Sequence, residues 1–233
     1  MPPGKSGSGN EADEGACAML KISFDNRHPM KVLCLGAHCD DIEIGCGGTI
    51  LRLADTMKDA SIHWIVFSSE GNRAKEALAS ARDFLTGTKD KKIILKRFPN
   101  SFFPYRGAEI KKYFEQLKRV VNPDIIFTHY RDDLHQDHRL ISELTWNTFR
   151  NHLILEYEIP KYDGDMGAPN FFVHMDEVVC RDKIDKILRH FPSQKEKSWF
   201  TGDTFLSLSR LRGVESNAPE NHAEGFYSRK IIF

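Results

Sequence analysis

The chain has 233 residues, of which 40% are hydrophobic, so it is long enough for one domain with an ordinary core. Its 33 Lys and Arg balance its 33 Asp and Glu without a basic block, which argues against nucleic acid as a partner. The chain contains no apolar run of membrane-spanning length and no secretory signal, and its five cysteines include no C-x-x-C pair. We therefore expect a cytoplasmic protein with no transmembrane segment.

The start of the chain differs in composition from the rest. It is rich in Gly, Ser, Pro and charged residues and poor in apolar ones, so it cannot offset the entropy lost on ordering. We expect residues 1–25 to form a disordered or weakly ordered tail, and residues 26–233 to form a single domain.

From Lys31 onward, short apolar runs alternate with segments of helical periodicity. The pattern predicts four strands and four helices, in the order Val32–Leu35, Glu43–Lys58, Ile62–Ser68, Arg73–Leu85, Ile93–Leu95, Glu109–Val121, Asp124–Thr128 and about His138–Phe149. Such alternation requires right-handed crossovers. It therefore predicts an α/β fold with a Rossmann-like, mostly parallel sheet and helices on both faces.

The last third of the chain is less regular. The pattern predicts strands at Leu153–Tyr157 and Phe171–His174, helices at Arg181–His190 and Asp203–Leu211, polar loops at Lys161–Asn170 and Gly213–Glu224, and an edge strand at Phe226–Phe233. We expect the loops Phe98–Arg106, Lys161–Asn170 and Gly213–Glu224 to select the substrate.

Polar side chains follow two of the predicted strands at the point where each strand ends. His38, Asp40 and Asp41 come after the first strand, and His135 and His138 come after the fourth. A parallel sheet is covered on both faces, so its ligand-binding groups lie best past the carboxyl ends of its strands. We therefore expect the two clusters to meet at one edge of the sheet.

Two imidazoles and one carboxylate suit a catalytic divalent metal that keeps one position for water or substrate. Such a metal lowers the pKa of its bound water to roughly 7 and polarises a carbonyl, as amide hydrolysis at neutral pH requires. Adjacent side chains on a turn diverge, so if Asp41 binds the metal, Asp40 is free to act as general base.

His135 is expected on the other side of the substrate carbonyl, where it would stabilise the oxyanion or protonate the leaving amine. A carboxylate beside it, from Asp137 or Asp133, would keep this imidazole charged and oriented. We count Asp137 with Asp40 and His135 as catalytic residues.

Ala37-His-Cys-Asp-Asp41 followed by Gly45-Cys-Gly-Gly48, and later His135-Gln-Asp-His138, resemble the paired motifs of the PIG-L/LmbE-like N-deacetylases. These zinc-dependent hydrolases remove an acetyl group from N-acetylglucosamine in a larger glycoconjugate. The resemblance implies Zn²⁺ as cofactor, a small-molecule amino-sugar substrate, His38, Asp41 and His138 as zinc ligands, Asp40 as general base, and His135 as oxyanion stabiliser or acid. Cys39 replaces the proline common in the family.

Two further fragments fit this resemblance. Ser69-Glu-Gly-Asn-Arg73 with Glu76 is similar to the family's glycine-containing loop, which implies that Arg73 contacts substrate. Ala223-Glu-Gly-Phe226 is similar to a short acidic-aromatic element near the family's C-terminus. His129 and Tyr130 are candidate substrate-binding residues, or they simply end their strand.

Several alternatives stay open. The chain could be a metal-dependent amidase acting on a thiol conjugate or an antibiotic intermediate, or a nucleotide- or sugar-binding module without catalysis. A dinucleotide enzyme is disfavoured, because the glycine cluster lacks the G-x-G-x-x-G spacing. Assembly into a homo-oligomer also stays open.

Overall fold

The computed structural model describes residues 28–232, so the tail expected over residues 1–25 lies outside its described part. The strands are β1 (Lys31–Gly36), β2 (Ser61–Val66), β3 (Asp90–Leu95), β4 (Ile125–His129), β5 (Leu153–Tyr157), β6 (Phe171–Met175) and β7 (His222–Ser228). The α-helices are α1 (Asp41–Thr56), α2 (Gly71–Phe84), α3 (Gly107–Val120), α4 (Gln136–Thr148), α5 (Glu177–His190) and α6 (Gly202–Glu215).

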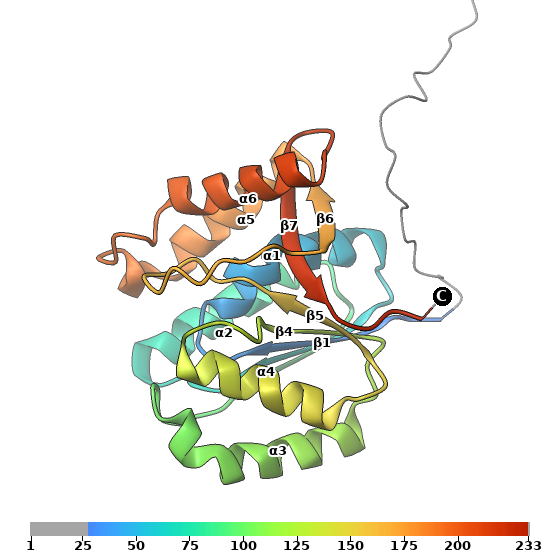
Figure 1. Cartoon of the computed structure of the whole chain (residues 1–233), viewed down its shortest axis with the longest axis vertical. Coiled ribbons are helices and arrows are strands. Elements are labelled where there is room, and N and C mark those ends of the chain that lie inside the picture. The colour runs from blue at the N-terminus through green and yellow to red at the C-terminus, as the bar shows by residue number, and fades with distance from the viewer. Residues whose placement is uncertain (1–27, 233) are drawn as a thin grey trace, which may run out of the picture.

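These elements form one α/β domain around a single sheet, in the strand order β3-β2-β1-β4-β5-β7-β6 (Figure 1). The first five strands are parallel, and β7 is antiparallel to both of its neighbours. The expected fold class is therefore confirmed. The chain order of the strands reverses between β1 and β4, and ligands of open α/β sheets bind at such a point.

The strand β1 is buried on both faces, as expected for the middle of a parallel sheet. Val32 and Cys34 face the core beneath α1, α2 and α5, whereas Leu33 and Leu35 face the core beneath α3 and α4. Because both faces of β1 are buried, the strand is held in place, and so is the start of the segment that follows it.

Helix α1 lies close against the sheet because its glycines have no side chains. A Cβ at Gly45 would come within 2.1 Å of the Tyr157 ring, and a Cβ at Gly48 within 2.1 Å of the Met175 sulfur. The glycine cluster therefore serves helix-to-strand packing.

Helix α1 is interrupted at Cys46, whose φ of −143° and ψ of 17° are not helical. Beyond this interruption the backbone N–H groups of Gly48 and Thr49 donate to the Glu224 carboxylate at 2.8 and 2.7 Å. Lys183 donates to the Ile44 carbonyl at 2.7 Å and pairs with Glu224 at 2.7 Å. Glu224 is thus a buried structural residue that fixes the helix.

The end of the chain corrects two predictions. Helix α6 continues to Glu215 and β7 begins at His222, so the range 213–224 is not one loop. The strand lies between β5 and β6, so it is not an edge strand, and β6 takes the edge. The sequence misleads here because Glu224 looks exposed, although α1 supplies its buried hydrogen-bond partners.

None of the helices in residues 28–232 combines the length and the apolar character needed to cross a membrane.

Candidate metal and active site

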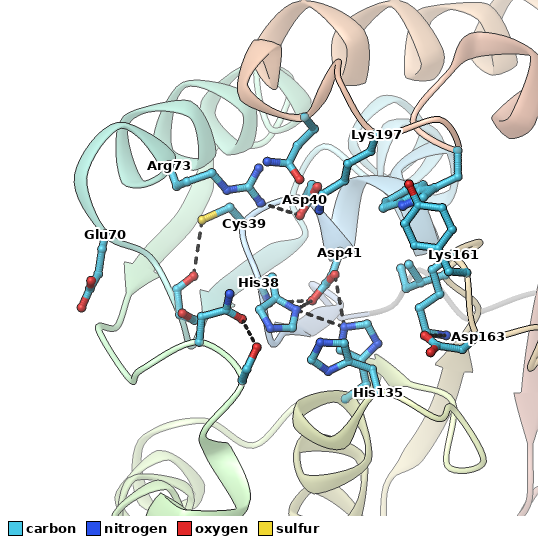
Figure 2. Close-up of a pocket in the computed structure, with 18 residues that line it drawn as sticks. His38, Cys39, Asp40, Asp41, Glu70, Arg73, His135, Lys161, Asp163 and Lys197 are labelled. Atoms are coloured by element: carbon cyan, nitrogen blue, oxygen red, sulfur yellow. Dashed lines mark hydrogen bonds and ion pairs between the residues drawn. The ribbon is translucent and has the colours of Figure 1, made fainter.

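A pocket of about 510 Å³ opens where β1 and β4 end (Figure 2). Its wall combines residues that follow several of the parallel strands with two later segments of the chain. The lining residues are His38, Cys39, Asp40, Asp41, Ser68, Glu70, Arg73, Asn100, Ser101, His135, His138, Ile159, Lys161, Tyr162, Asp163, Gln194, Lys197 and Trp199.

The three expected metal ligands converge at the base of this pocket. His38 Nδ1 lies 3.1 Å from His138 Nε2 and 3.4 Å from Asp41 Oδ2, and His138 Nε2 lies 3.6 Å from Asp41 Oδ1. Three donors around one zinc ion at bond lengths of 2.0–2.1 Å are roughly 3.3 Å apart in tetrahedral geometry. These separations are of the size that ligands of one metal ion require, although the two histidines are measured to different oxygens of Asp41. In the described part of the chain, the groups of side chains that could hold a metal ion are His38, His135 and His138, and Asp41, His129 and His138.

The second ring nitrogen of each histidine lies within hydrogen-bond distance of a carboxylate oxygen. His38 Nε2 lies 3.2 Å from Asp137 Oδ2, and His138 Nδ1 lies 2.9 Å from Asp133 Oδ2. Metal-binding histidines are held in this way almost without exception, because the carboxylate fixes the tautomer and the orientation of the ring. Asp137 and Asp133 thus orient the two candidate ligands.

This arrangement corrects the expected role of Asp137 and Asp133, which was to hold His135. Helix α4 starts at Gln136, so Asp137 lies in its first turn. The Asp137 carboxylate accepts hydrogen bonds from the backbone N–H groups of Ser101 at 2.7 Å and Phe103 at 3.1 Å. The same carboxylate therefore ties the loop after β3 to His38.

The electrostatics of the donor set favour a cation. Burial alone would raise the pKa of Asp41, but the neighbouring imidazoles of His138, His129 and His38 hold it well below its usual range. Burial lowers the pKa of His38, yet Asp41 and Asp137 more than offset this and raise it to about 10. Burial and the nearby His129 lower the pKa of His138 to about 3, so this imidazole is neutral. The positive charge at this point is therefore carried by the His38 imidazole, which lies between the carboxylates of Asp41 and Asp137.

Asp40 diverges from Asp41 and lines the pocket beside the donor set (Figure 2). Its Oδ1 accepts a hydrogen bond from Arg73 Nη2 at 2.8 Å, and both side chains are largely buried. The guanidinium also lies over the Phe191 ring, 5.8 Å from its centroid. Arg73 lines the pocket and contacts Asp40, while the expected contact of Arg73 with substrate stays a prediction.

His135 lies against both candidate histidine ligands, with ring centroids 4.8 Å from His38 and 4.5 Å from His138. Its Nδ1 accepts the backbone N–H of Asp137 at 3.2 Å, so the neutral ring carries its proton on Nε2. Burial, followed by the nearby His38, lowers the pKa of His135. The expected charged imidazole is therefore replaced by a neutral hydrogen-bond donor.

His129 and Tyr130, the other expected substrate contacts, do not line the pocket. His129 is fully buried behind the donor set: its Nε2 accepts the Ala37 N–H at 2.9 Å, and its ring stacks on His138 with centroids 3.9 Å apart. Tyr130 stacks on Tyr227 with centroids 3.8 Å apart. His129 therefore supports the donor set from behind, whereas Tyr130 packs on Tyr227 outside the pocket.

Cys39 lies in the pocket wall, and its Sγ is 3.4 Å from the Ser68 carbonyl. Burial raises the pKa of this thiol to about 12, so it stays protonated and is not a nucleophile.

The far wall of the pocket contains residues that sequence reasoning missed. Gln194, Lys197 and Trp199 come from the connection between α5 and α6, and this connection meets the one between β5 and β6 where Tyr162 Oη lies 3.3 Å from Ser198 Oγ. Two of the three loops expected to select substrate line the pocket, whereas residues 213–224 do not. The only signal in this connection is an aromatic residue in a polar stretch.

A family model described as GlcNAc-PI de-N-acetylase, PIG-L, matches residues 33–149. Among solved structures, N,N'-diacetylchitobiose deacetylase from Pyrococcus horikoshii is 22% identical, with 88% of this chain and 87% of that chain covered and a TM-score of 0.63. The conserved protein TT1542 from Thermus thermophilus is 20% identical, with 88% and 96% covered and a TM-score of 0.67.

GalB, the 4-carboxy-2-hydroxymuconate hydratase from Pseudomonas putida, is also similar, at 16% identity, with 88% and 98% covered and a TM-score of 0.66. At such identities the similarity establishes the fold alone. A hydratase and a deacetylase share this fold, so the chemistry of this chain must be argued from its own site.

Proposed function

The chain belongs to the PIG-L family, and from this membership and the geometry of its site we propose that it is a zinc-dependent N-deacetylase acting on an amino sugar of the N-acetylglucosamine type. The observation that carries the proposal is the convergence of three donors, with separations of 3.1 to 3.6 Å, beside the Asp40 carboxylate in a pocket. The products are acetate and a free amine.

The residues that would hold zinc are His38 through Nδ1, His138 through Nε2, and Asp41. When bound there, zinc supplies Lewis-acid chemistry, since it lowers the pKa of its water to roughly 7 and polarises a carbonyl. Asp133 and Asp137 keep the two imidazoles in the tautomers that this binding requires.

Asp40 is the general base in this proposal. It takes a proton from the attacking water as the oxygen adds to the amide carbon, and the proton passes to the nitrogen as the C–N bond breaks. Arg73 orients the carboxylate, because one of its two oxygens accepts the guanidinium hydrogen bond at 2.8 Å.

His135 stabilises the oxygen of the substrate carbonyl as negative charge develops on it. The neutral ring has its Nδ1 occupied by the Asp137 N–H, so Nε2–H is the donor available to the pocket. This geometry supports oxyanion stabilisation by a neutral imidazole.

The far wall of the pocket suits a sugar. Tyr162 and Trp199 line this wall, and aromatic rings offer apolar surface on which the apolar face of a sugar ring can pack. Lys197 lies over the Trp199 ring, with its Nζ 5.4 Å from the ring centroid. The pocket volume of about 510 Å³ lies in the usual range for small-molecule sites.

Acetate release from a panel of N-acetylglucosamine conjugates, measured with and without added Zn²⁺, tests the proposal. We expect at least one conjugate to release stoichiometric acetate and amine in a zinc-dependent way. If the protein hydrolysed only an amide without a sugar, that amide, and not an amino sugar, would be the substrate class. Binding of conjugates without acetate release under any metal condition would contradict the deacetylase assignment.

A further inference from the structure

Lys161 belongs to the pocket wall, and no role proposed above uses it. It comes from the connection between β5 and β6, and its side chain is only 8% exposed. Its Nζ lies 3.0 Å from Asp133 Oδ2, pairs closely with Asp165, and lies 3.9 Å from Asp163. Lysines are buried to this extent almost only when they are paired, so Lys161 is held in place.

Asp133 is the group that links this lysine to the donor set. Its Oδ2 receives both Lys161 Nζ and His138 Nδ1, the latter at 2.9 Å, and its Oδ1 accepts the backbone N–H of His135 at 2.7 Å. Lys161, Asp133 and His138 therefore form a row of contacts that ends at His138 Nε2, which is 3.1 Å from His38 Nδ1. Figure 2 shows Lys161 on the side of the pocket opposite Arg73.

We propose that Lys161 is a positioning residue for the metal ligand His138 and acts through Asp133. Its ammonium group balances the charge of the buried carboxylate and fixes it where it accepts the Nδ1 proton. The Nε2 lone pair is then directed at the metal position. The inference rests on the proposed function only in that it takes His138 as a metal ligand. It also makes the pocket-lining connection between β5 and β6 part of the metal site.

The rival explanation is that Lys161 merely anchors this connection through Asp165. Asp165 Oδ2 also accepts the backbone N–H of Leu134 at 2.7 Å. Asp165→Asn removes the charge of that anchor but keeps an acceptor for Leu134 and leaves Lys161 beside Asp133. It is therefore the matched control for Lys161→Met, which keeps the length of the side chain and removes its charge.

The test is the Zn²⁺ dissociation constant, measured without substrate by competition with a chromogenic chelator. We expect Lys161→Met to weaken zinc binding by about 10- to 100-fold, as loss of a partner that orients a metal ligand does. Asp165→Asn should leave zinc binding near wild type, and Lys161→Arg should recover part of the affinity because it keeps the charge. In an Asp133→Asn background, Lys161→Met should cause no further loss, because the group it acts through is already changed.

Zinc binding by Lys161→Met at wild-type affinity would overturn the proposal, as would an equal loss in the Asp133→Asn background. Circular dichroism of the metal-free variants checks that each one folds. If Lys161→Met does not fold, Lys161→Arg compared in the two backgrounds carries the same test. A wild-type chain that binds zinc but releases no acetate from any conjugate overturns the proposed function and leaves this proposal standing.

Discussion

Asp40 and Asp41 are neighbours in the chain, yet their surroundings differ. Three imidazoles surround Asp41, whose Oδ2 also accepts the backbone N–H of His38 at 2.6 Å, whereas Asp40 contacts the guanidinium of Arg73. A carboxylate among imidazoles that converge on one point is suited to a cation. A carboxylate held by one oxygen at the pocket wall is suited to proton transfer.

Asp40→Asn should therefore lower turnover by at least a hundredfold, in line with general-base contributions of about 10²–10⁴, because the amide cannot accept the proton of the attacking water. Zinc content and melting temperature should stay at wild-type values. Steady-state kinetics with metal analysis check this, and near-normal turnover would refute the assignment.

Arg73→Met should lower turnover by up to about a hundredfold, because a misplacement of about 1 Å in a catalytic group has an effect of this size. Because Arg73 is proposed to act through Asp40, the loss should disappear in an Asp40→Asn background. Kinetics of the two single variants and the double variant measure this coupling. Additive losses would mean that Arg73 acts on the substrate directly.

Helix α1 is the element that joins the site to the sheet. Its first residue is Asp41, and its glycines bring its backbone onto Tyr157 of β5 and Met175 of β6. Glu224 and Lys183 fix the helix at its interruption, from segments more than a hundred residues away. The position of Asp41, the proposed carboxylate ligand of the metal, thus depends on packing along the whole helix.

Gly45→Ala should destabilise the fold by about 1–3 kcal/mol, because the added methyl group would lie 2.1 Å from the Tyr157 ring. Gly107→Ala is the matched control, since a Cβ there meets only Leu140 at 3.9 Å, and it should leave stability unchanged or slightly raised. Urea denaturation measures both. Equal stabilities for the two variants would contradict the close packing of α1.

Asp83 joins α2 to α5, where it pairs with Lys186 at 3.2 Å, Arg189 at 2.8 Å and His190 at 2.7 Å. Burial alone would raise the pKa of Asp83, but these groups more than offset it and lower the pKa. The resulting stabilisation is therefore complete above the ordinary carboxyl pKa of about 3.9 and is lost as the pH falls through the lowered value.

Asp83→Asn should cost about 0.5–1 kcal/mol at pH 6 and progressively less below pH 4. Denaturation curves for wild type and variant over this pH range measure the difference. A difference that grows on acidification would show that the pairing with α5 is not its source.

The whole molecule shows which features a sequence can predict. The parallel fold and the meeting of His38, Asp41 and His138 follow from local signals, because each cluster comes directly after an apolar strand and such strands end at one edge. The carboxylate partners of the imidazoles do not follow, since they depend on where α4 begins and how the loop after β3 folds back.

Long-range contacts explain the remaining differences. Glu224 reads as an exposed loop residue until α1 is placed beside it, 175 residues earlier in the chain. The segment from Gln194 to Trp199 has no periodicity, and only the packing of α5 and α6 brings it over the carboxyl edge of the sheet. Neither the contact of Glu224 nor the position of this segment can be inferred until the arrangement of the complete sheet is known.

Whether His38 and His138 bind one zinc ion can be decided from the zinc content of the purified wild type and of the variants His38→Ala, His138→Ala and Asp40→Asn. We expect one zinc ion per chain in wild type and Asp40→Asn and none in either histidine variant, with all four proteins folded. Stoichiometric zinc in both histidine variants would contradict it.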